Sequence, residues 1–452
     1  MTSTEWAPGN EVGQLSTATS HMSPGADGAA HAPLRAFSQT GTDESRGRVL
    51  IIVQNLPVPF DRRVWLESRT LRSAGYEVSV VCPKGPGDPG YAVLEGVEIY
   101  KYRPYAPGGS KFSYIAEYVY SFAATLWLTI KASRRGRFAA IQSCNPPDIF
   151  WPIGLLFRLV HGSRFVFDHH DLCPETYESR FPGGPSVVLR ALRLMEKLTM
   201  KSADHVISTN DSYRGLVMDR DGVPAERSTV VRTGPDPERL KARQSVPELR
   251  RGRRYLVAYI GVMGPQDGVD IVLRVADFLV HKMQRYDISF TLIGSGDCFD
   301  ELVALRDELH LQEYVHFTGR APDAQVAEVL STADVGISPD PKNPLNDLST
   351  MNKTMEYMAF GLPVVAFDLR ETRVSAADAA IYATPNEVDD MARLLSDLLD
   401  DPERRRVMGA AGRARIEREL AWPHQALHYL DVYDRVVGAA PKRAQQRAAA
   451  AS

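Results

Sequence analysis

Cysteine is scarce in this chain. Its 452 residues include four cysteines, Cys82, Cys144, Cys173 and Cys298, and no two of them have the short spacing of a metal-binding pair. This excludes a disulfide framework and favours reduced thiols in a cytoplasmic protein. An excess of positive charge is also lacking, because the net charge is −3. We therefore expect no metal site and no nucleic-acid partner.

The first 46 residues lack a basic run followed by an apolar run, so no signal peptide is expected there. These residues are rich in Gly, Ser, Thr, Ala and Pro, and we expect them to be disordered, as we do for residues 439–452. The remaining chain is too long for one ordinary core, which predicts two domains. A hydrophobic content of 44% and a charged content of 24% are typical of a soluble globular protein.

Between the tails, short apolar runs rich in β-branched residues alternate with helical patterns. This alternation is typical of parallel sheets with helices on both faces. The expected strands are 49–53, 78–82, 97–100, 140–143, 165–168, 205–208 and 229–231, then 255–261, 289–293, 315–318, 335–338, 363–367 and 380–382. They predict two doubly wound α/β domains, 47–235 and 236–420. Ligands of such sheets bind beyond the carboxyl ends of the strands, and here this places them in a cleft between the domains.

One segment of the second domain predicts a helix whose first turn can bind a diphosphate. Ser349 or Thr350 is a natural N-cap and Gly361 a natural stop. The free amides of a first turn attract anions, and Lys353 adds a full positive charge there. Glu356 shares the face of Lys353, about 5–6 Å away, where a carboxylate could bind ribose hydroxyls. The alternative is an ordinary ion pair on a solvated helix.

This segment resembles the donor-binding helix of retaining glycosyltransferases of family 4. The family pattern is an acidic residue, a gap of seven, a second Glu, a small residue, Gly and a Pro-Val-Val strand. Glu356 matches the second Glu, which is the family's ribose ligand. Leu348 stands at the first acidic position, where the family's Glu contacts the donor sugar, so Asp347 or Asp340 would have to replace it.

The resemblance extends over nearly the whole chain between the tails and implies the GT-B fold. In that fold two Rossmann-like domains face each other across a cleft, and a C-terminal helix crosses back to the first domain. The segment 421–438, with Trp422, Leu427, Tyr429 and Tyr433, resembles that crossing helix.

A proline-stiffened loop ending in Asp61-Arg62-Arg63 follows the first expected strand and opens a helix. It is similar to the Pro-x-Asp-Arg-Arg variant common among bacterial family 4 enzymes of surface-polysaccharide synthesis. The resemblance implies that Asp61, Arg62 and Arg63 lie at the cleft, where they could contact phosphate or acceptor. One of the two arginines is expected to be only a solvated residue of the first turn.

The strand 165–168 leads into His169-His170-Asp171. A His-Asp dipeptide at this place resembles the family's active-site histidine, which contacts the donor sugar. The alignment gives that role to His170, with Asp171 beside it, and leaves His169 structural. Neighbouring residues of an extended chain point apart, and the family works without metal, so these two histidines predict no metal site.

A glycine-rich loop around Gly264 follows the first strand of the second domain. Glycines let the backbone approach phosphate oxygens closely. Much of family 4 places an Arg and a Lys in this loop to hold the donor diphosphate, and both are missing here. This departure from the family either disables donor binding or transfers the charge to another residue. The candidates for transfer are Lys353, with Asn352 beside it at the start of the helix, and Arg320, which lies next to the expected site of the base; the Lys at the first turn of the ribose-binding helix favours transfer.

The segment 113–130 carries a single charge, Glu117, among many aromatic and apolar residues, and basic residues follow it. Such a helix can lie in a bilayer interface, and packing against the sheet is an equally open alternative. A second helix, 186–201, adds a positive stripe of Arg190, Arg193, Lys197 and Lys201.

Together these features predict a cytoplasmic, retaining, metal-independent glycosyltransferase that needs no cofactor. It would move a sugar from a UDP- or GDP-linked donor to a saccharide or lipid-linked saccharide, in polysaccharide or cell-envelope glycan synthesis. Contact with the inner face of the membrane is left open as a further interaction. Two alternatives remain: a sugar-nucleotide epimerase of the same architecture, and a non-catalytic GT-B partner subunit that has lost its donor clamp.

Overall fold

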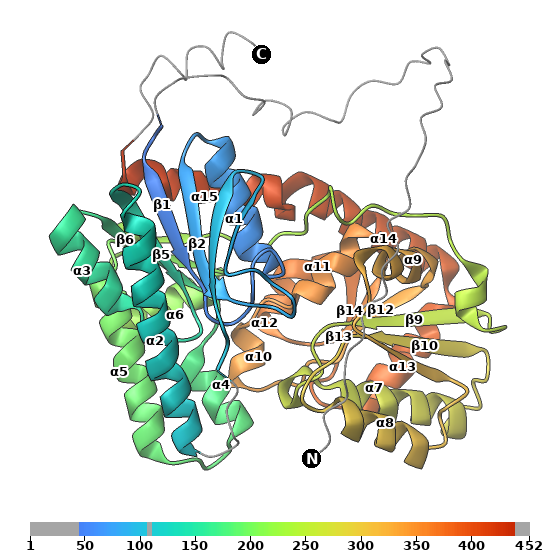
Figure 1. Ribbon diagram of the computed structural model, residues 1–452. Helices are drawn as coiled ribbons and strands as arrows, with labels where there is room; N and C mark the ends of the chain where they lie inside the picture. Colours follow the sequence, from blue (N-terminus) through green and yellow to red (C-terminus); the bar gives the residue numbers. More distant parts are fainter. Residues whose placement is uncertain (1–44, 106–110, 439–452) are drawn as a thin grey trace, which may run out of the picture. The chain divides into compact units, whose positions relative to one another are not determined.

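The computed structural model describes residues 45–105 and 111–438, with the side chains of residues 111–115 left out (Figure 1). The tails expected to be disordered lie outside the described residues, apart from residues 45 and 46. Two β-sheets organise the described chain, as the alternating pattern predicts.

The first sheet has eight strands in the order β3-β4-β2-β1-β5-β6-β7-β8. Their bounds are β1 Arg48–Ile52, β2 Glu77–Pro83, β3 Tyr91–Leu94, β4 Val97–Tyr102, β5 Phe138–Cys144, β6 Arg164–His169, β7 His205–Ser208 and β8 Ser228–Val230. Every strand predicted for this half is present, and β3 was missed. It pairs antiparallel with β4 through a two-residue turn, Glu95-Gly96, in which both residues have positive φ. The other pairings of this sheet are parallel.

Helices cover both faces of this sheet. They are α1 Arg62–Ser73, α2 Lys111–Ser133, α3 Trp151–His161, α4 Cys173–Arg180, α5 Ser186–Ser202 and α6 Asp211–Asp221, with a short η2 at Ala225–Arg227. One apolar cluster joins α1 to β1 and β2, and another joins α2 and α3 to β1 and β5. Met200 of α5 and Val217 of α6 pack over β6 and β7.

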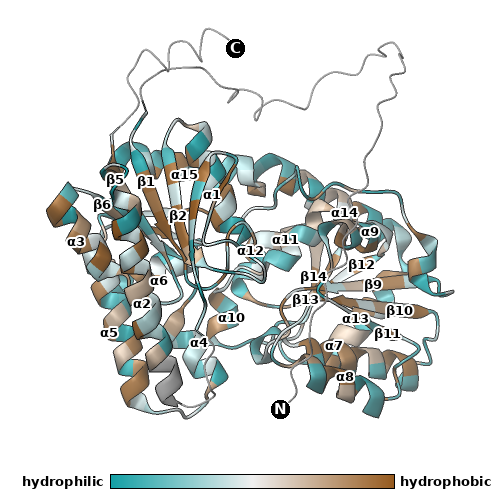
Figure 2. Cartoon of the chain, in the orientation of Figure 1, coloured by the Kyte–Doolittle hydropathy of each residue, from teal (hydrophilic) through white to brown (hydrophobic). Residues whose placement is uncertain are grey.

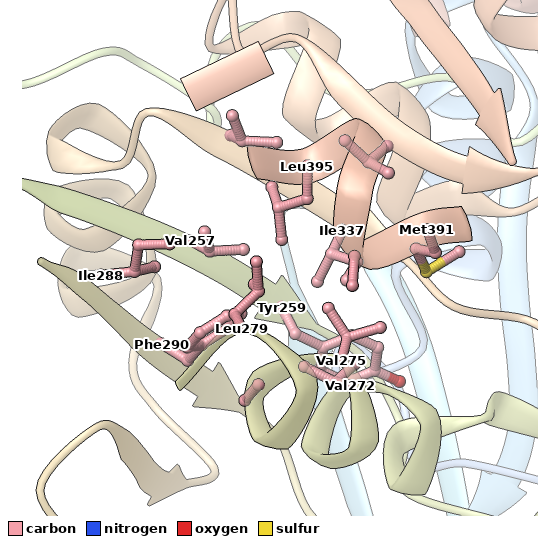
Figure 3. Close-up of a cluster of buried hydrophobic side chains, with 14 of the residues drawn as sticks. Val257, Tyr259, Val272, Val275, Leu279, Ile288, Phe290, Ile337, Met391 and Leu395 are labelled. Atoms are coloured by element: carbon pink, nitrogen blue, oxygen red, sulfur yellow. The ribbon is translucent and has the colours of Figure 1, made fainter. Parts of the chain in front are cut away.

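The second sheet has six strands in the order β11-β10-β9-β12-β13-β14, and its pairings are parallel. The strands are β9 Tyr255–Ile260, β10 Ile288–Ile293, β11 Val315–Gly319, β12 Val335–Ser338, β13 Val364–Phe367 and β14 Ala380–Ala383. Each strand predicted for this half is present, within one residue at either end. One face of this sheet carries the cluster of Figure 3, in which side chains of β9 and β10 meet those of α7 and α13. The opposite face packs against α9 and α11.

The helices of the second half complete the chain. They are η3 Pro247–Arg250, η4 Pro265–Asp267, α7 Val269–Asp277, η5 Phe278–Lys282, α8 Phe299–Glu308, α9 Asp323–Thr332, α10 Pro344–Leu348, α11 Asn352–Ala359, α12 Arg370–Ala376, η6 Ala377–Ala379, α13 Val388–Asp400, α14 Pro402–Arg415, η7 Ile416–Leu420 and α15 Trp422–Val436.

The last helix, α15, packs on the first sheet. Tyr429 and Tyr433 are fully buried in the cluster formed by β1, β2 and α1, and the indole of Trp422 donates to the hydroxyl of Thr70 at 3.0 Å. Leu427, which the sequence placed with these residues, is 59% exposed instead. The chain thus returns from the second sheet to the first, as expected for the crossing helix.

The predicted donor-binding helix differs from the expectation at its start. Residues 349–351 separate the short α10 from α11, whose N-cap is Met351 and not Ser349 or Thr350. The hydroxyls of those two residues are used elsewhere. Ser349 donates to the carbonyl of Leu345, and Thr350 accepts from the Asn210 amide. The helix ends before Gly361, whose φ of 71° is the left-handed conformation expected of a stop.

Candidate active site

Lys353 lies in the first turn of α11 with only 9% of its side chain exposed. Its ammonium group forms an ion pair with Asp340 and lies 5.4 Å from the ring centre of Tyr259. Burial lowers the pKa of Lys353, but the carboxylates of Asp340 and Asp267 outweigh it and raise the pKa above its usual value. Lys353 is therefore a charged group at a helix N-terminus.

The glycine loop of the second domain lies directly against this cation. A Cβ built on Gly261 would stand 3.2 Å from Cε of Lys353. The backbone N–H of Gly264 donates to the carboxylate of Asp267 at 3.0 Å, so this amide has a protein partner. Burial raises the pKa of Asp267, and Lys353 opposes that shift. The loop thus holds an acid, Asp267, and Lys353 is a cation that packs directly against it.

The carboxylate of Glu356 is held by two arginines. Arg239 Nη2 donates to Oε1 at 2.8 Å, and Arg62 Nη1 lies 3.6 Å from the same oxygen. Asp323 joins the two guanidinium groups, at 2.7 Å from Arg62 and 3.0 Å from Arg239. No ion pair links Glu356 to Lys353 among the described residues, which rules out the alternative of a simple pair within the helix.

Two further predicted contacts lie near this group. Arg320 is exposed just after β11, with its guanidinium 5.4 Å from the ring centre of Phe60, a half-exposed residue of the loop before α1. Asn352 is exposed as the first residue of α11. Both side chains are therefore accessible, and their roles stay predictions.

The two candidate replacements for the missing first Glu are engaged elsewhere. Asp340 accepts from Lys353 and from the hydroxyl of Ser338. Asp347 accepts from the backbone N–H of Arg370 and pairs with Lys342. Contact of either carboxylate with a donor sugar remains a prediction.

His170 follows β6 with 16% of its side chain exposed, and its Nε2 lies 2.5 Å from Oδ2 of Asp168. The side chain of Asn145 fixes this loop, since its Oδ1 accepts from the backbone N–H groups of His170 and Asp171 at 2.6 and 3.1 Å. Asp171 itself is exposed. His169 is fully buried, and burial and Arg220 lower its pKa to about 3, so it is neutral.

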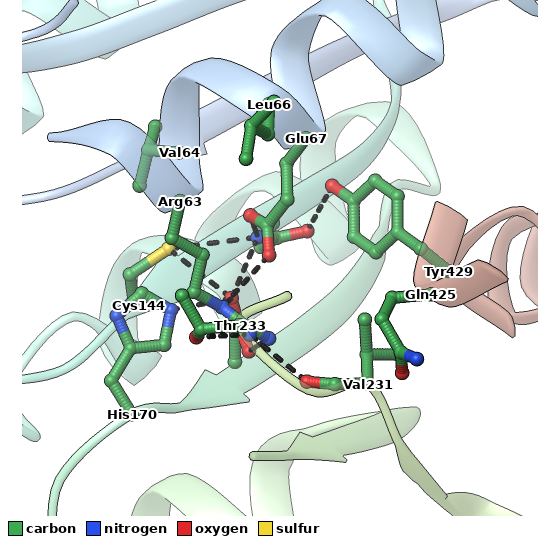
Figure 4. Close-up of polar contacts among 12 residues, drawn as sticks. Arg63, Val64, Leu66, Glu67, Cys144, His170, Val231, Thr233, Gln425 and Tyr429 are labelled. Atoms are coloured by element: carbon green, nitrogen blue, oxygen red, sulfur yellow. Dashed lines mark hydrogen bonds and ion pairs between the residues drawn. The ribbon is translucent and has the colours of Figure 1, made fainter. Parts of the chain in front are cut away.

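Arg63 corrects a prediction, because it lies inside the first domain and not at an open cleft (Figure 4). It is 5% exposed, and its guanidinium binds Asp168 through two nitrogens, at 3.1 and 2.8 Å. Its third nitrogen donates to the carbonyl of Val231 and the hydroxyl of Thr233, both at 2.9 Å. Successive side chains on α1 are about 100° apart, so Arg62 can face outward, with 48% of its side chain exposed, while Arg63 lies on the helix face of buried Val64 and Glu67. Asp61, between loop and helix, caps α1 by accepting from Val64 N–H.

Cys144, Asp168 and His170 are the one group of possible metal ligands in the described part of the chain, with ligand atoms within 4.8 Å. Both oxygens of Asp168 already accept from Arg63, and Nε2 of His170 faces the same carboxylate. A cation at this place would lie against a guanidinium, which does not fit metal binding.

Sequence reasoning missed Arg239, Asn145 and Asp168. Asn145 opens the sequence Asn-Pro-Pro at the end of β5, and polar residues at the carboxyl ends of parallel strands are a usable signal. Asp168 ends the apolar run of β6, and a carboxylate there was an equal signal. Arg239 lies in the irregular stretch after β8, where no periodicity predicts its contact with Glu356.

Solved structures with the same architecture cover most of this chain. Sucrose-phosphate synthase from Thermosynechococcus elongatus superposes with a TM-score of 0.68 at 17% identity, covering 87% of this chain and 100% of that one. Anabaena Alr3699/HepE, in complex with UDP and glucose, gives a TM-score of 0.64 at 14% identity, covering 86% and 100%. The fold is therefore GT-B.

Two family models match consecutive parts of the chain. The model described as Glycosyltransferase Family 4 matches residues 61–239, and that described as Glycosyl transferases group 1 matches residues 241–415. The chain belongs to glycosyltransferase family 4.

Two curated relatives match shorter stretches of the chain at higher sequence identity. MMP alpha-(1->4)-mannosyltransferase of Mycolicibacterium hassiacum is 24% identical over 54% of this chain and 57% of its own length. D-inositol 3-phosphate glycosyltransferase of Thermomonospora curvata is 27% identical over 54% of this chain and 60% of its own. The chain thus spans little more than half the length of these two relatives.

Proposed function

We propose that this protein is a retaining, metal-independent glycosyltransferase without a cofactor. It transfers a sugar from a UDP- or GDP-linked donor to a saccharide or lipid-linked saccharide in polysaccharide or cell-envelope glycan synthesis. In this proposal Lys353, Asn352, the Gly264 backbone and Arg320 bind the diphosphate side of the donor, and Glu356 binds its ribose. His170 and Asp171 face the sugar, while Arg62 and Asp61 lie toward the acceptor.

The observation that carries this proposal is the position of Lys353. A charged ammonium group, a helix N-terminus and a glycine loop meet at one place, and each favours the oxygens of a diphosphate. These groups would stabilise the charge that develops on the leaving phosphate. The test is calorimetry with UDP, GDP and dTDP, followed by a sugar-transfer assay with the nucleotide that binds. Absence of binding by all three would contradict the proposal.

Retention of the anomeric configuration requires its own test. The pair of His170 and Asp168 is the group that would serve as a base if the reaction inverted. We expect the leaving phosphate to assist the acceptor instead, as the family resemblance implies. The configuration of the first product, read by NMR before mutarotation, decides between the two, and an inverted product would refute retention.

An apolar face on the first domain supports a membrane-bound acceptor. Exposed apolar residues lie on α2, α3 and α5, where Figure 2 shows hydrophobic stretches; they include Trp127, Leu159, Val160, Val187 and Leu194. Basic residues of α5 lie beside them, and no helix of the described residues is long and apolar enough to span a bilayer. The opposite face of α2, with Leu128 and Ala132, packs on the sheet. This arrangement suits a helix surface that rests on an anionic membrane.

Co-sedimentation with vesicles that contain anionic lipid tests this part across a salt series. We expect binding at low salt that falls as salt rises and that is weakened by Arg190→Glu together with Arg193→Glu. A charge-matched control is Arg404→Glu with Arg406→Glu, on exposed residues of α14 in the second domain. No binding at low salt would point to a soluble acceptor.

One observation favours the non-catalytic partner subunit as a second candidate. The Asp267 carboxylate occupies the Gly264 amide, where a phosphate would bind. If this bond persists in the presence of nucleotide, Asp267→Asn should strengthen UDP or GDP binding. Tight binding by the unmodified protein, with measurable transfer, would exclude this candidate.

A further inference from the structure

Asp168 is surrounded by hydrogen-bond donors. Arg63 donates to both of its oxygens, the amide of Gln142 lies 3.4 Å from Oδ2, and the thiol of Cys144 lies 3.9 Å from the same oxygen. Guanidinium and amide nitrogens can only donate. Burial opposes ionisation of Asp168, but the charge of Arg63 and the hydrogen bonds from His170 and Arg63 prevail and lower its pKa below the usual range. Asp168 is therefore an ionised carboxylate, and the acid beside it, Glu67, keeps its proton because burial and the charge of Asp168 raise its pKa well above the usual value.

This environment determines which ring nitrogen of His170 carries the proton. Nε2 lies 2.5 Å from Oδ2 of Asp168, and two acceptors cannot share a hydrogen bond, so Nε2 must donate. Nδ1 makes no hydrogen bond within the described residues, and the ring is partly exposed. In the neutral ring Nδ1 is then an open hydrogen-bond acceptor.

Gln142 connects this pair to the crossing helix. Its Nε2 donates to Glu67 at 2.7 Å, on the same side as Asp168. Its Oε1 accepts from the hydroxyls of Tyr429 and Tyr433 at 2.8 and 2.7 Å. Because Gln142 is fully buried and each end of its amide has a partner of the matching kind, its orientation is fixed. A chain of hydrogen bonds therefore runs from α15 to the carboxylate that holds His170.

We propose that Asp168 locks His170 in the form with the proton on Nε2, so that Nδ1 accepts a hydrogen bond from a hydroxyl of the donor sugar. Gln142, Tyr429 and Tyr433 are positioning residues of this pair and do not touch the substrate. No proton is transferred, because the histidine only recognises the hydroxyl. The proposal rests on the proposed function for the identity of the sugar, but the proton position on the ring is a property of the protein alone.

Nitrogen-15 NMR of the full-length protein tests the proton position directly. The chain has 11 histidines, so the ring of His170 is assigned by comparison with His170→Gln. We expect a protonated Nε2 and an unprotonated Nδ1 in the neutral ring. A proton on Nδ1 would overturn the proposal, even in a protein that transfers sugar. If NMR shows the expected tautomer but the protein transfers no sugar in the assay, the proposed function is contradicted and the tautomer assignment is not.

Asp168→Asn provides the kinetic test. Arg63 requires an acceptor, so the new amide should turn its oxygen to Arg63 and its NH₂ group to His170, which reverses the tautomer. We expect kcat/KM for the donor to fall about 10- to 100-fold, the size of the loss when one hydrogen bond to the substrate is replaced by two facing donors, while affinity for UDP or GDP alone stays within about twofold. An unchanged kcat/KM in the folded variant, or an unchanged tautomer, would overturn the proposal.

A pair of milder changes tests the positioning residues without removing a buried charge. Tyr429→Phe combined with Tyr433→Phe should lower kcat about 3- to 10-fold and leave UDP or GDP affinity unchanged. Tyr76→Phe is the matched control, because Tyr76 is fully buried against Tyr433, with ring centres 5.8 Å apart, and its hydroxyl makes no hydrogen bond. Equal kcat values for the control and the double variant would refute a positioning role.

Discussion

Arg63 of the first domain and Lys353 of the second each lie in the interior beside two acidic side chains, and the two arrangements differ in how many of the cation's donors they leave free. In the first domain Arg63 donates to Asp168, Val231 and Thr233 and pairs with Glu67 at 3.0 Å. In the second, the ammonium of Lys353 has one hydrogen-bond partner, Asp340. An ammonium carries three donors, so Lys353 keeps capacity for a ligand, whereas every nitrogen of the Arg63 guanidinium already has a protein partner. A buried cation indicates a binding site only when its donors are not already used.

Removal of Arg63 should give the largest effect in this comparison. Arg63→Ala leaves Asp168 buried without its partner, and losing one member of a buried ion pair costs about 3–5 kcal/mol of unfolding free energy. Chemical denaturation followed by circular dichroism measures this loss. Arg62→Ala, a change to the exposed neighbour, is the control and should cost less than about 1 kcal/mol. Similar losses for both would contradict the assignment of Arg63 to the interior.

Removal of Lys353 should act on ligand binding. We expect Lys353→Ala to weaken UDP or GDP about 10- to 100-fold and to leave uridine or guanosine nearly unaffected, because only the diphosphate meets the ammonium group. Calorimetry with nucleotide and nucleoside makes the comparison. If both ligands lose affinity equally, Lys353 resembles Arg63 and is structural.

Asp148 sharpens the comparison because this buried carboxyl has no cation beside it. It is 4% exposed, neither oxygen has a hydrogen-bond partner, and burial raises its pKa from 3.8 to about 7. The contribution of protonated Asp148 to the free energy of unfolding is therefore complete below pH 3.8, and it is lost as the pH rises through 7 and the buried carboxyl ionises. Asp148→Asn should be more stable than the unmodified protein at pH 8, by roughly 2–4 kcal/mol, and equally stable near pH 4. Thermal unfolding across pH 4–8 measures this, and a constant difference would refute the burial argument.

Loss of the Glu356 charge should have the smallest effect. Glu356 lies between Arg239 and Arg62 and is partly exposed, so solvent screens the interaction. We expect Glu356→Gln to weaken UDP and uridine alike by about 3- to 10-fold, through the ribose hydroxyls. A 2′,3′-dideoxy nucleotide that binds as tightly as the normal one would show that no ribose contact is made.

The sheets were predictable from the sequence because their strands are buried and rich in β-branched residues. This pattern is local, so it can be recognised without knowing which residues pack against each strand. β3 escaped because its residues are mostly exposed, and only the turn Glu95-Gly96 marks it. The start of α11 was misplaced because Ser349 and Thr350 are good caps that tertiary partners, Tyr213 and Asn210, engage instead.

The candidate site was harder to predict where contacts join distant parts of the chain. Glu356 and Lys353 could be found from one helix, but the partners Arg239 and Asp340 could not, since no local periodicity links them. In the same way, the surroundings of Asp168 bring together β5, α1 and the loop after β8. Local patterns therefore locate functional residues, and only the folded chain shows which of them are already engaged.

The indole of Trp422 has a practical consequence. It is 5% exposed and hydrogen-bonded to Thr70, a residue 352 positions earlier in the chain. Departure of α15 from the first domain would put this ring into water and shift its emission to longer wavelength. With Trp6, Trp65, Trp127 and Trp151 replaced by phenylalanine, fluorescence would then report the docking of the crossing helix in real time, without any attached label.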